Sequence, residues 1–166
     1  SCMIDGPSQF DFYSGGGLDI AFLGFGEIDA VGNVNVSKLG GNTVGPGGFI
    51  DIAQNARKVV FCGTFDTGGA RTEVGSGVMR VTEHGRISKL VDKVDQITFS
   101  GPQSLLQGQK VIYITERAVF ELRENGLHII EIAPGIDLQT DLLDRMGFVP
   151  NMNSPLSEMD SNYFKK

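Results

Sequence analysis

The order of two apolar runs, a glycine-rich loop and a short amphipathic segment limits this chain of 166 residues to few folds. Residues 18–24 form an apolar run between glycines and predict a buried strand, and residues 33–38 alternate with period two, as in a half-buried strand. A glycine-rich loop over 40–48 precedes a predicted short helix at 49–56, and the β-branched segment 57–64 predicts a central strand. A helix between strands favours an α/β fold with an open, mostly parallel sheet.

The second half of the chain has patterns typical of antiparallel hairpins, which we expect as additions to this sheet. Residues 71–99 contain short runs broken by glycines. Residues 110–122 and 126–132 predict a second hairpin that turns at Arg123-Glu124-Asn125-Gly126, because Asn-Gly is a strong hairpin signal.

The C-terminal region predicts a helix and then a polar segment. Asp137 suits the N-cap of a helix that continues through Met146, and Gly147 suits its end. Residues 150–166 are polar and contain two prolines, so they predict a tail or a wrapping arm. With no internal repeat and no long linker, we expect one domain over residues 1–149 and a polar tail at 150–166.

Composition excludes several classes of protein. Hydrophobic residues make up 40% of the chain, which is too many for a disordered protein. The net charge of −6 argues against a nucleic-acid partner, because no basic face is available to displace phosphate counterions. No apolar stretch approaches the ~20 residues of a membrane span, so we expect no membrane partner and a cytoplasmic location.

The cysteines and histidines give no sign of a metal site. Cys2, Cys62, His84 and His128 share no ligand spacing, so we expect no bound metal. Cys62 lies in an apolar run and is expected to pack as a small buried hydrophobe. The chain begins without an initiator methionine at position 1, and aromatic residues are frequent at 9–13. From this start we expect a piece of a longer protein.

The loop Gly45-Pro46-Gly47-Gly48 is the strongest candidate for a ligand site. Glycines permit backbone conformations closed to other residues and let a ligand approach the main chain, and their N–H groups precede a predicted helix. Such a loop can hold an oxyanion or a phosphate. It can equally be a plain turn before a helix, because glycine loops are weak motifs.

Several separated segments of the chain carry a family resemblance when they are taken together. They are QFDFYSGGGLD at 9–19, GNVNVSK at 32–38, GPGGFIDIAQNA at 45–56, KVVF at 58–61, QITFSGP at 96–102, TERAVF at 115–120 and IAPGID at 132–137. In this order, and covering about residues 9–148, they resemble the family I coenzyme A transferases of the propionate and acetate type. The resemblance implies that residues 1–149 are the C-terminal, β-subunit-like domain of such an enzyme, incomplete at its N-terminus, with a three-layer α/β architecture.

The resemblance also implies a ping-pong exchange of coenzyme A (CoA) between a short-chain acyl-CoA and a carboxylate through a glutamyl-CoA thioester. In that family the nucleophilic glutamate lies upstream of the glycine triplet, in a Glu-x-Gly motif, and no such motif precedes Gly15 here. We therefore expect the nucleophile upstream of residue 1, and this chain alone to be inactive. Glu124-Asn125-Gly126 imitates a nucleophile motif, but its position between two predicted strands identifies it as a hairpin turn.

The matching segments assign the remaining site residues. Gly45, Gly47 and Gly48 are the candidates for donating a backbone N–H to the thioester oxygen, with the donor among them left open. The candidates for lining the CoA and substrate site are Asn35, Lys38, Phe49, Gln54 and Asn55. Lys38 fits either attraction of the CoA phosphates or a solvated lysine at a strand end.

The resemblance implies further partners and a metabolic setting. The partners are acyl-CoA and carboxylate substrates, the missing N-terminal portion of the same enzyme and further copies in a homo-oligomer. CoA thioester is a substrate, and no permanently bound cofactor is expected. Short-chain fatty acid or ketone body metabolism is the implied setting. Two other classes stay open: an acyl-CoA or nucleotide-binding module without catalysis, and a structural assembly domain.

Overall fold

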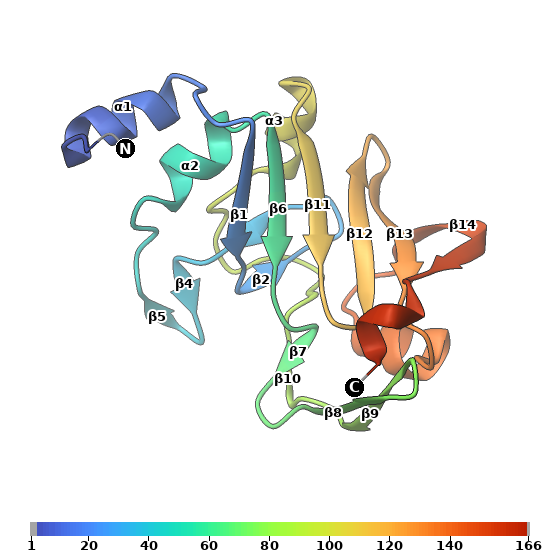
Figure 1. Cartoon of the computed structure of the whole chain (residues 1–166). Helices are drawn as coiled ribbons and strands as arrows, with labels where there is room; N and C mark the ends of the chain where they lie inside the picture. Colours follow the sequence, from blue (N-terminus) through green and yellow to red (C-terminus); the bar gives the residue numbers. More distant parts are fainter. Residues whose placement is uncertain (1–2, 166) are drawn as a thin grey trace.

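A six-stranded sheet forms the centre of the fold in the computed structural model, which describes residues 3–165 (Figure 1). In spatial order its strands are β1 (Ile20–Gly24), β6 (Lys58–Cys62), β11 (Lys110–Ile114), β12 (Ala118–Arg123), β13 (Gly126–Ile132) and β14 (Asn151–Glu158). The pairs β1–β6, β6–β11 and β13–β14 are parallel, and β11–β12 and β12–β13 are antiparallel. The predicted open, mostly parallel sheet with helices and antiparallel additions is confirmed.

Strand β6 carries the centre of the hydrophobic core, as the prediction of a central strand at 57–64 required. It lies between β1 and β11, and Phe61 is fully buried. The Phe61 ring lies 5.8 Å from the ring of Phe49, 5.0 Å from that of Phe99 and 5.3 Å from that of Tyr113, measured between centroids. These aromatic side chains join the helical layer to the sheet.

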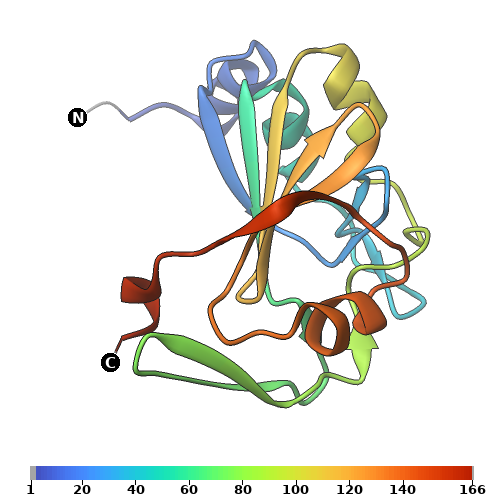
Figure 2. The ribbon, with the colours of Figure 1, turned by 90° about the vertical axis from the view of Figure 1, so that its right-hand side faces the viewer.

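The helices cover one face of the parallel strands (Figure 2). Helix α2 was predicted at 49–56, and its residues Phe49 and Ala53 are buried against the sheet, as is Ala56 just after it. The α-helices are α1 (Gly6–Ser14), α2 (Phe49–Asn55) and α3 (Gly101–Leu106). Within residues 3–165 no helix has the length and hydropathy needed to cross a membrane.

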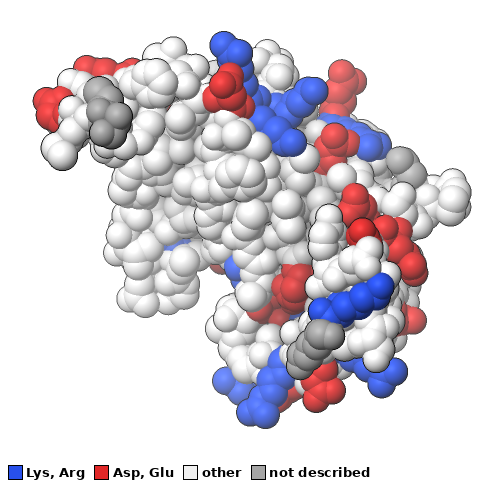
Figure 3. Space-filling model, in the orientation of Figure 1, with Lys and Arg blue, Asp and Glu red and all other residues white. Residues whose placement is uncertain are grey.

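The opposite face of the same strands is open, which corrects two predictions. Strand β1 is an edge strand rather than a buried one, because Ile20 and Phe22 point away from the helices and are exposed, Phe22 by 66%. Cys62 is likewise exposed, because it too lies on the face away from the helices. Ile114 of β11 extends the apolar surface, and the uncharged centre of this face is visible in Figure 3. Contiguous apolar surface of this kind usually marks an interaction site.

Short two-stranded ladders surround the central sheet, and some of them lie beyond the carboxyl ends of the parallel strands (Figure 1). The segment 33–38 is not one strand but parts of two, with a turn between them in which the Asn35 carboxamide accepts the N–H groups of Ser37 and Lys38. Of the hairpins expected within 71–99, the structure contains one, over 71–83, and residues 87–88 pair instead with 66–67. The ladders are β2 (Glu27–Ile28) with β3 (Val34–Asn35), β4 (Lys38–Leu39) with β5 (Asn42–Thr43), β7 (Asp66–Thr67) with β10 (Ile87–Ser88), and β8 (Arg71–Gly75) with β9 (Val78–Glu83).

The segment 110–132 forms three strands rather than one hairpin. The predicted turn between β12 and β13 is confirmed, with Arg123 paired to Gly126 and Glu124 exposed at the tip. The prediction of one continuous strand over 110–122 is wrong, because the chain also reverses its direction between β11 and β12. There the Thr115 hydroxyl oxygen accepts the N–H groups of Arg117 and Ala118, which closes a turn that contains no glycine or proline.

The C-terminal segment departs from the predicted α-helix and tail. The Asp137 carboxylate accepts the Thr140 N–H, so the predicted cap is confirmed. The helix is irregular, however, with a π-helical turn η1 (Leu138–Leu142) followed by a 3-10 turn η2 (Leu143–Arg145). In the π-helical turn, the Asp141 carbonyl oxygen accepts a hydrogen bond from the Arg117 side chain. Of the segment predicted at 150–166, residues 150–165 form a wrapping arm rather than a loose tail: β14 extends the sheet, and a 3-10 turn η3 (Ser161–Phe164) buries Phe164 beside Met79.

Candidate functional site

The loop before helix α2 has two backbone amides that the fold leaves free. Gly45 and Gly47 have φ of +80° and +54°, which L-residues with side chains rarely adopt. The Gly45 N–H donates to Ser37 O, and the Phe49 N–H donates to Pro46 O. The N–H groups of Gly47 and Gly48 donate to no acceptor in the described part of the chain. Of the three predicted donors, only these two amides are available to a ligand.

Helix α1 borders this loop. A Cβ atom built on Gly48 would lie 2.7 Å from the Phe10 ring, whereas one built on Gly47 would meet no atom within 4 Å. Gly47 is therefore the more open of the two candidate donors. Helix α2 has only seven residues, so the amides themselves, rather than a long helix dipole, define what the loop offers to an anion.

Two predicted ligand-lining residues, Asn35 and Lys38, lie in the strands that lead to the loop. Asn35 is fully buried, and its Nδ2 donates to Glu27 Oε2 at 2.7 Å and to Lys38 O at 2.5 Å. The Lys38 ammonium is half-exposed and pairs with Asp95 at 3.0 Å. Both side chains are engaged within the protein, so their predicted contact with substrate stays a prediction.

The other predicted residues are spread along helix α2. Phe49 is buried in the aromatic core, at the end of the helix next to Gly48. Gln54 and Asn55 lie at the opposite end, where they line a polar pocket of about 570 Å³ beside the amino ends of β6 and β11. The structure thus brings Asn35 and Lys38 near the start of the glycine loop but places Gln54 and Asn55 elsewhere.

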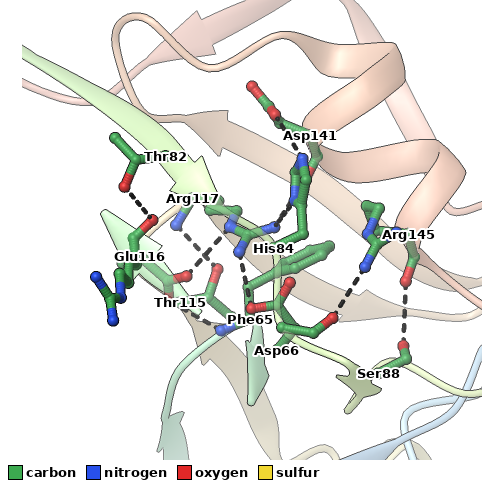
Figure 4. Close-up of polar contacts among 12 residues, drawn as sticks. Phe65, Asp66, Thr82, His84, Ser88, Thr115, Glu116, Arg117, Asp141 and Arg145 are labelled. Atoms are coloured by element: carbon green, nitrogen blue, oxygen red, sulfur yellow. Dashed lines mark hydrogen bonds and ion pairs between the residues drawn. The ribbon is translucent and has the colours of Figure 1, made fainter. Parts of the chain in front are cut away.

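A buried polar cluster at the carboxyl ends of β6 and β11 was not predicted (Figure 4). Its centre is Arg117, which is fully buried and whose Nη2 lies 2.8 Å from Asp66 Oδ1. Arg117 Nη1 donates to Asp141 O at 3.1 Å and lies 3.4 Å from His84 Nδ1. Arg117 Nε lies 3.2 Å from Glu116 Oε1, as an ion pair without the alignment of a hydrogen bond. Glu116 in turn accepts the Phe65 N–H at 2.8 Å. The cluster fixes the loops that follow two parallel strands, the edge where α/β proteins bind ligands.

Local sequence signals do not reveal this cluster, because its residues come from four distant segments. Thr115-Glu116-Arg117 lies in a segment that matches the CoA-transferases, but neither its burial nor its partners follow from that match. Among residues 3–165 no group of three or more His, Cys, Asp or Glu side chains has the geometry of a metal site; Cys2 lies outside the described residues.

Comparison with known proteins relates the whole chain to part of larger enzymes. The chain is 50% identical over 162 residues to the acetate CoA-transferase YdiF of Escherichia coli O157:H7, covering 98% of this chain and 30% of that protein. It is 47% identical over 168 residues to the caffeate CoA-transferase of Acetobacterium woodii, covering 98% and 32%. No family model matches the chain.

Solved structures agree with this relationship. The crystal structure of the YdiF apoenzyme from E. coli O157:H7 matches with a TM-score of 0.96 over 98% of this chain and 32% of that one. YdiF has also been solved as a thioester complex with CoA. The glutaconate CoA-transferase of Acidaminococcus fermentans, at 18% identity and a TM-score of 0.71, shares the fold. The predicted resemblance to CoA-transferases is confirmed, and the chain spans about a third of the length of these relatives.

Proposed function

We propose that this chain, a homologue of the acetate and caffeate CoA-transferases, is part of an enzyme that transfers CoA from a short-chain acyl-CoA to a carboxylate. The observation that carries the proposal is the 50% identity to an acetate CoA-transferase along 98% of the chain. The free amides of Gly47 and Gly48 support it, because acyl transfer needs donors aimed at a developing oxyanion.

The proposed reaction is a double displacement. A glutamate carboxylate attacks the thioester carbonyl, the carbonyl electrons move to oxygen, and collapse of this oxyanion expels CoA thiolate and leaves an acyl–glutamyl anhydride. The thiolate then attacks the glutamyl carbonyl and displaces the first carboxylate, which gives a glutamyl-CoA thioester. An incoming carboxylate runs the same two steps in reverse. Each addition creates one oxyanion, on the acyl carbonyl oxygen in the first step and on the glutamyl carbonyl oxygen in the second, and fixed backbone donors stabilise such a charge.

Within this scheme the chain supplies the glycine loop, and the remainder of the enzyme supplies the nucleophile. The open face of β1, β6 and β11 supports this division, since Ile20, Phe22 and Ile114 need a covering layer. We propose that the missing portion of the same enzyme covers this face. We further propose a cytoplasmic homo-oligomer that acts in short-chain fatty acid or ketone body metabolism.

The proposal predicts that this chain alone does not exchange CoA between acetyl-CoA and propionate, because no residue takes the place of the nucleophile. The assay follows propionyl-CoA formation by the purified chain, with the complete enzyme as positive control. Turnover by the isolated chain that disappears in Glu124→Ala would overturn the division of roles. Glu124 lies at the exposed tip of the β12–β13 turn, so this variant leaves the fold intact.

A further inference from the structure

A second cavity lies at the carboxyl ends of β1 and β6, beside the β4–β5 hairpin and the β7–β10 ladder. Its volume is about 440 Å³, and its lining includes Leu39 and Ile87 as apolar residues and Thr64 and Thr67 as polar ones. Apolar walls with a few polar groups are typical of pockets for small organic ligands. The carboxyl edge is also where open α/β sheets bind their ligands.

Lys89 supplies the one cation of this lining. Its side chain is half-buried, and its Nζ lies 4.0 Å from the centroid of the Phe25 ring. Within residues 3–165 this ammonium makes no hydrogen bond and no ion pair. Burial lowers the pKa of Lys89, an effect that the nearby charge of Glu116 opposes. A partly desolvated ammonium without an acceptor is costly, and a bound anion relieves that cost.

The neighbouring carboxylates do not serve as acceptors for the Lys89 ammonium. Glu27 lines the cavity, but its Oε2 accepts from Asn35 Nδ2 at 2.7 Å and from the Asp95 N–H at 3.0 Å. Glu116 is held by the Phe65 N–H and by Arg117. By contrast, the lysine on the adjoining hairpin, Lys38, has its own carboxylate partner in Asp95.

The backbone at the end of β6 is shaped around Lys89. A Cβ atom on Gly63 would lie 2.9 Å from Lys89 Nζ and 2.8 Å from the Phe25 ring. Glycine at this position therefore allows the ammonium to lie directly against the carboxyl end of β6.

We propose that Lys89 binds an oxyanion of a ligand whose apolar part lies in this cavity. The identity of that ligand rests on the proposed function, in which two substrates carry suitable groups. CoA carries phosphate oxygens on a long chain, and a short-chain acid carries a carboxylate. The shared chemistry is one oxyanion held by one ammonium, charge-assisted and shielded from water on the Phe25 side.

The test measures binding of CoA and of butyrate to this chain, since all residues that line the cavity belong to it. Lys89→Met is compared with Lys93→Met, which removes an exposed lysine four residues away. Loss of a charge-assisted contact in a partly buried site is expected to weaken binding by about 10-fold to 100-fold in Lys89→Met only. Weakening of CoA alone identifies a phosphate, and weakening of butyrate alone identifies the carboxylate. Unchanged affinity for both ligands would overturn the proposal.

A second measurement needs no variant and also guards against misfolding of Lys89→Met. Reductive methylation with a ¹³C label gives each lysine its own NMR signal, whose pKa is then followed with and without ligand. A bound oxyanion stabilises the ammonium, so the pKa of Lys89 should rise on ligand addition while that of Lys93 stays fixed. A Lys89 signal unaffected by saturating CoA and butyrate contradicts the proposal. These experiments involve no acyl transfer, so failure of the complete enzyme to exchange CoA, with intact Lys89-dependent binding, would refute the proposed function and leave this site standing.

Discussion

Replacing Arg117 with methionine is expected to lower the free energy of unfolding by about 3–5 kcal/mol, because it leaves the Asp66 carboxylate buried without its counter-charge. Asp66 is 2% exposed, and its Oδ2 already has no hydrogen-bond partner in the described part of the chain. The substitution also frees the Asp141 carbonyl at the π-helical turn. Urea unfolding followed by circular dichroism measures the change.

Arg123→Met is the matched control for this prediction. Arg123 forms an ion pair with Glu121 at 2.7 Å, but both side chains are partly exposed, so its loss should cost about 0–1 kcal/mol. The double variant Arg117→Met with Asp66→Leu should recover much of the lost stability, because replacing a buried pair by apolar groups is often neutral. If the free energy of unfolding of Arg117→Met lies within about 1 kcal/mol of that of the parent chain, the buried pair does not hold these loops together.

In the complete enzyme, Gly47→Val is expected to slow the chemical step by about 100-fold to 1,000-fold, since one oxyanion donor is displaced. Affinity for CoA should change far less, because the interaction is made chiefly in the transition state. Single-turnover kinetics with acetyl-CoA separate the two quantities, and thermal melts report on folding.

Gly45→Val separates loss of the donor from backbone strain. Gly45 also has a positive φ and open space around a Cβ atom, but its N–H is already bound to Ser37 O. Both variants strain the loop, so strain alone predicts equal losses of activity and stability. The oxyanion role requires that Gly47→Val lose acyl transfer well beyond Gly45→Val. Near-normal transfer in a stably folded Gly47→Val enzyme would remove Gly47 from the mechanism.

Local patterns predicted the elements whose signals are complete within a few residues. The β-branched run at 57–64, the apolar face of α2 and the Asn-Gly turn each specify their structure directly. The burial of 18–24 and of Cys62 was predicted wrongly, because an apolar run does not tell which face of a strand is covered. The turn after β11 was missed because Thr115 closes it with a side-chain hydrogen bond rather than with glycine or proline.

The candidate site could be predicted from the sequence only in part. The glycine loop follows from sequence, but the commitment of the Gly45 amide to Ser37, which leaves Gly47 and Gly48 as donors, requires the backbone path. The Arg117 cluster depends on Asp66 and Asp141, which are 51 and 24 residues away in the chain. Such long-range pairs carry no periodic or spacing signal, and neither does the cavity at Lys89.

The most direct test of the central claim is to locate the covalent CoA thioester in the complete enzyme. The enzyme is incubated with acetyl-CoA, digested at low pH and mapped by mass spectrometry, with hydroxylamine treatment as the control that removes a thioester. The account predicts a CoA adduct on a glutamate that lies outside residues 1–166, and its loss or strong reduction in Gly47→Val. An adduct on Glu124, or on any other glutamate of this chain, would contradict the account.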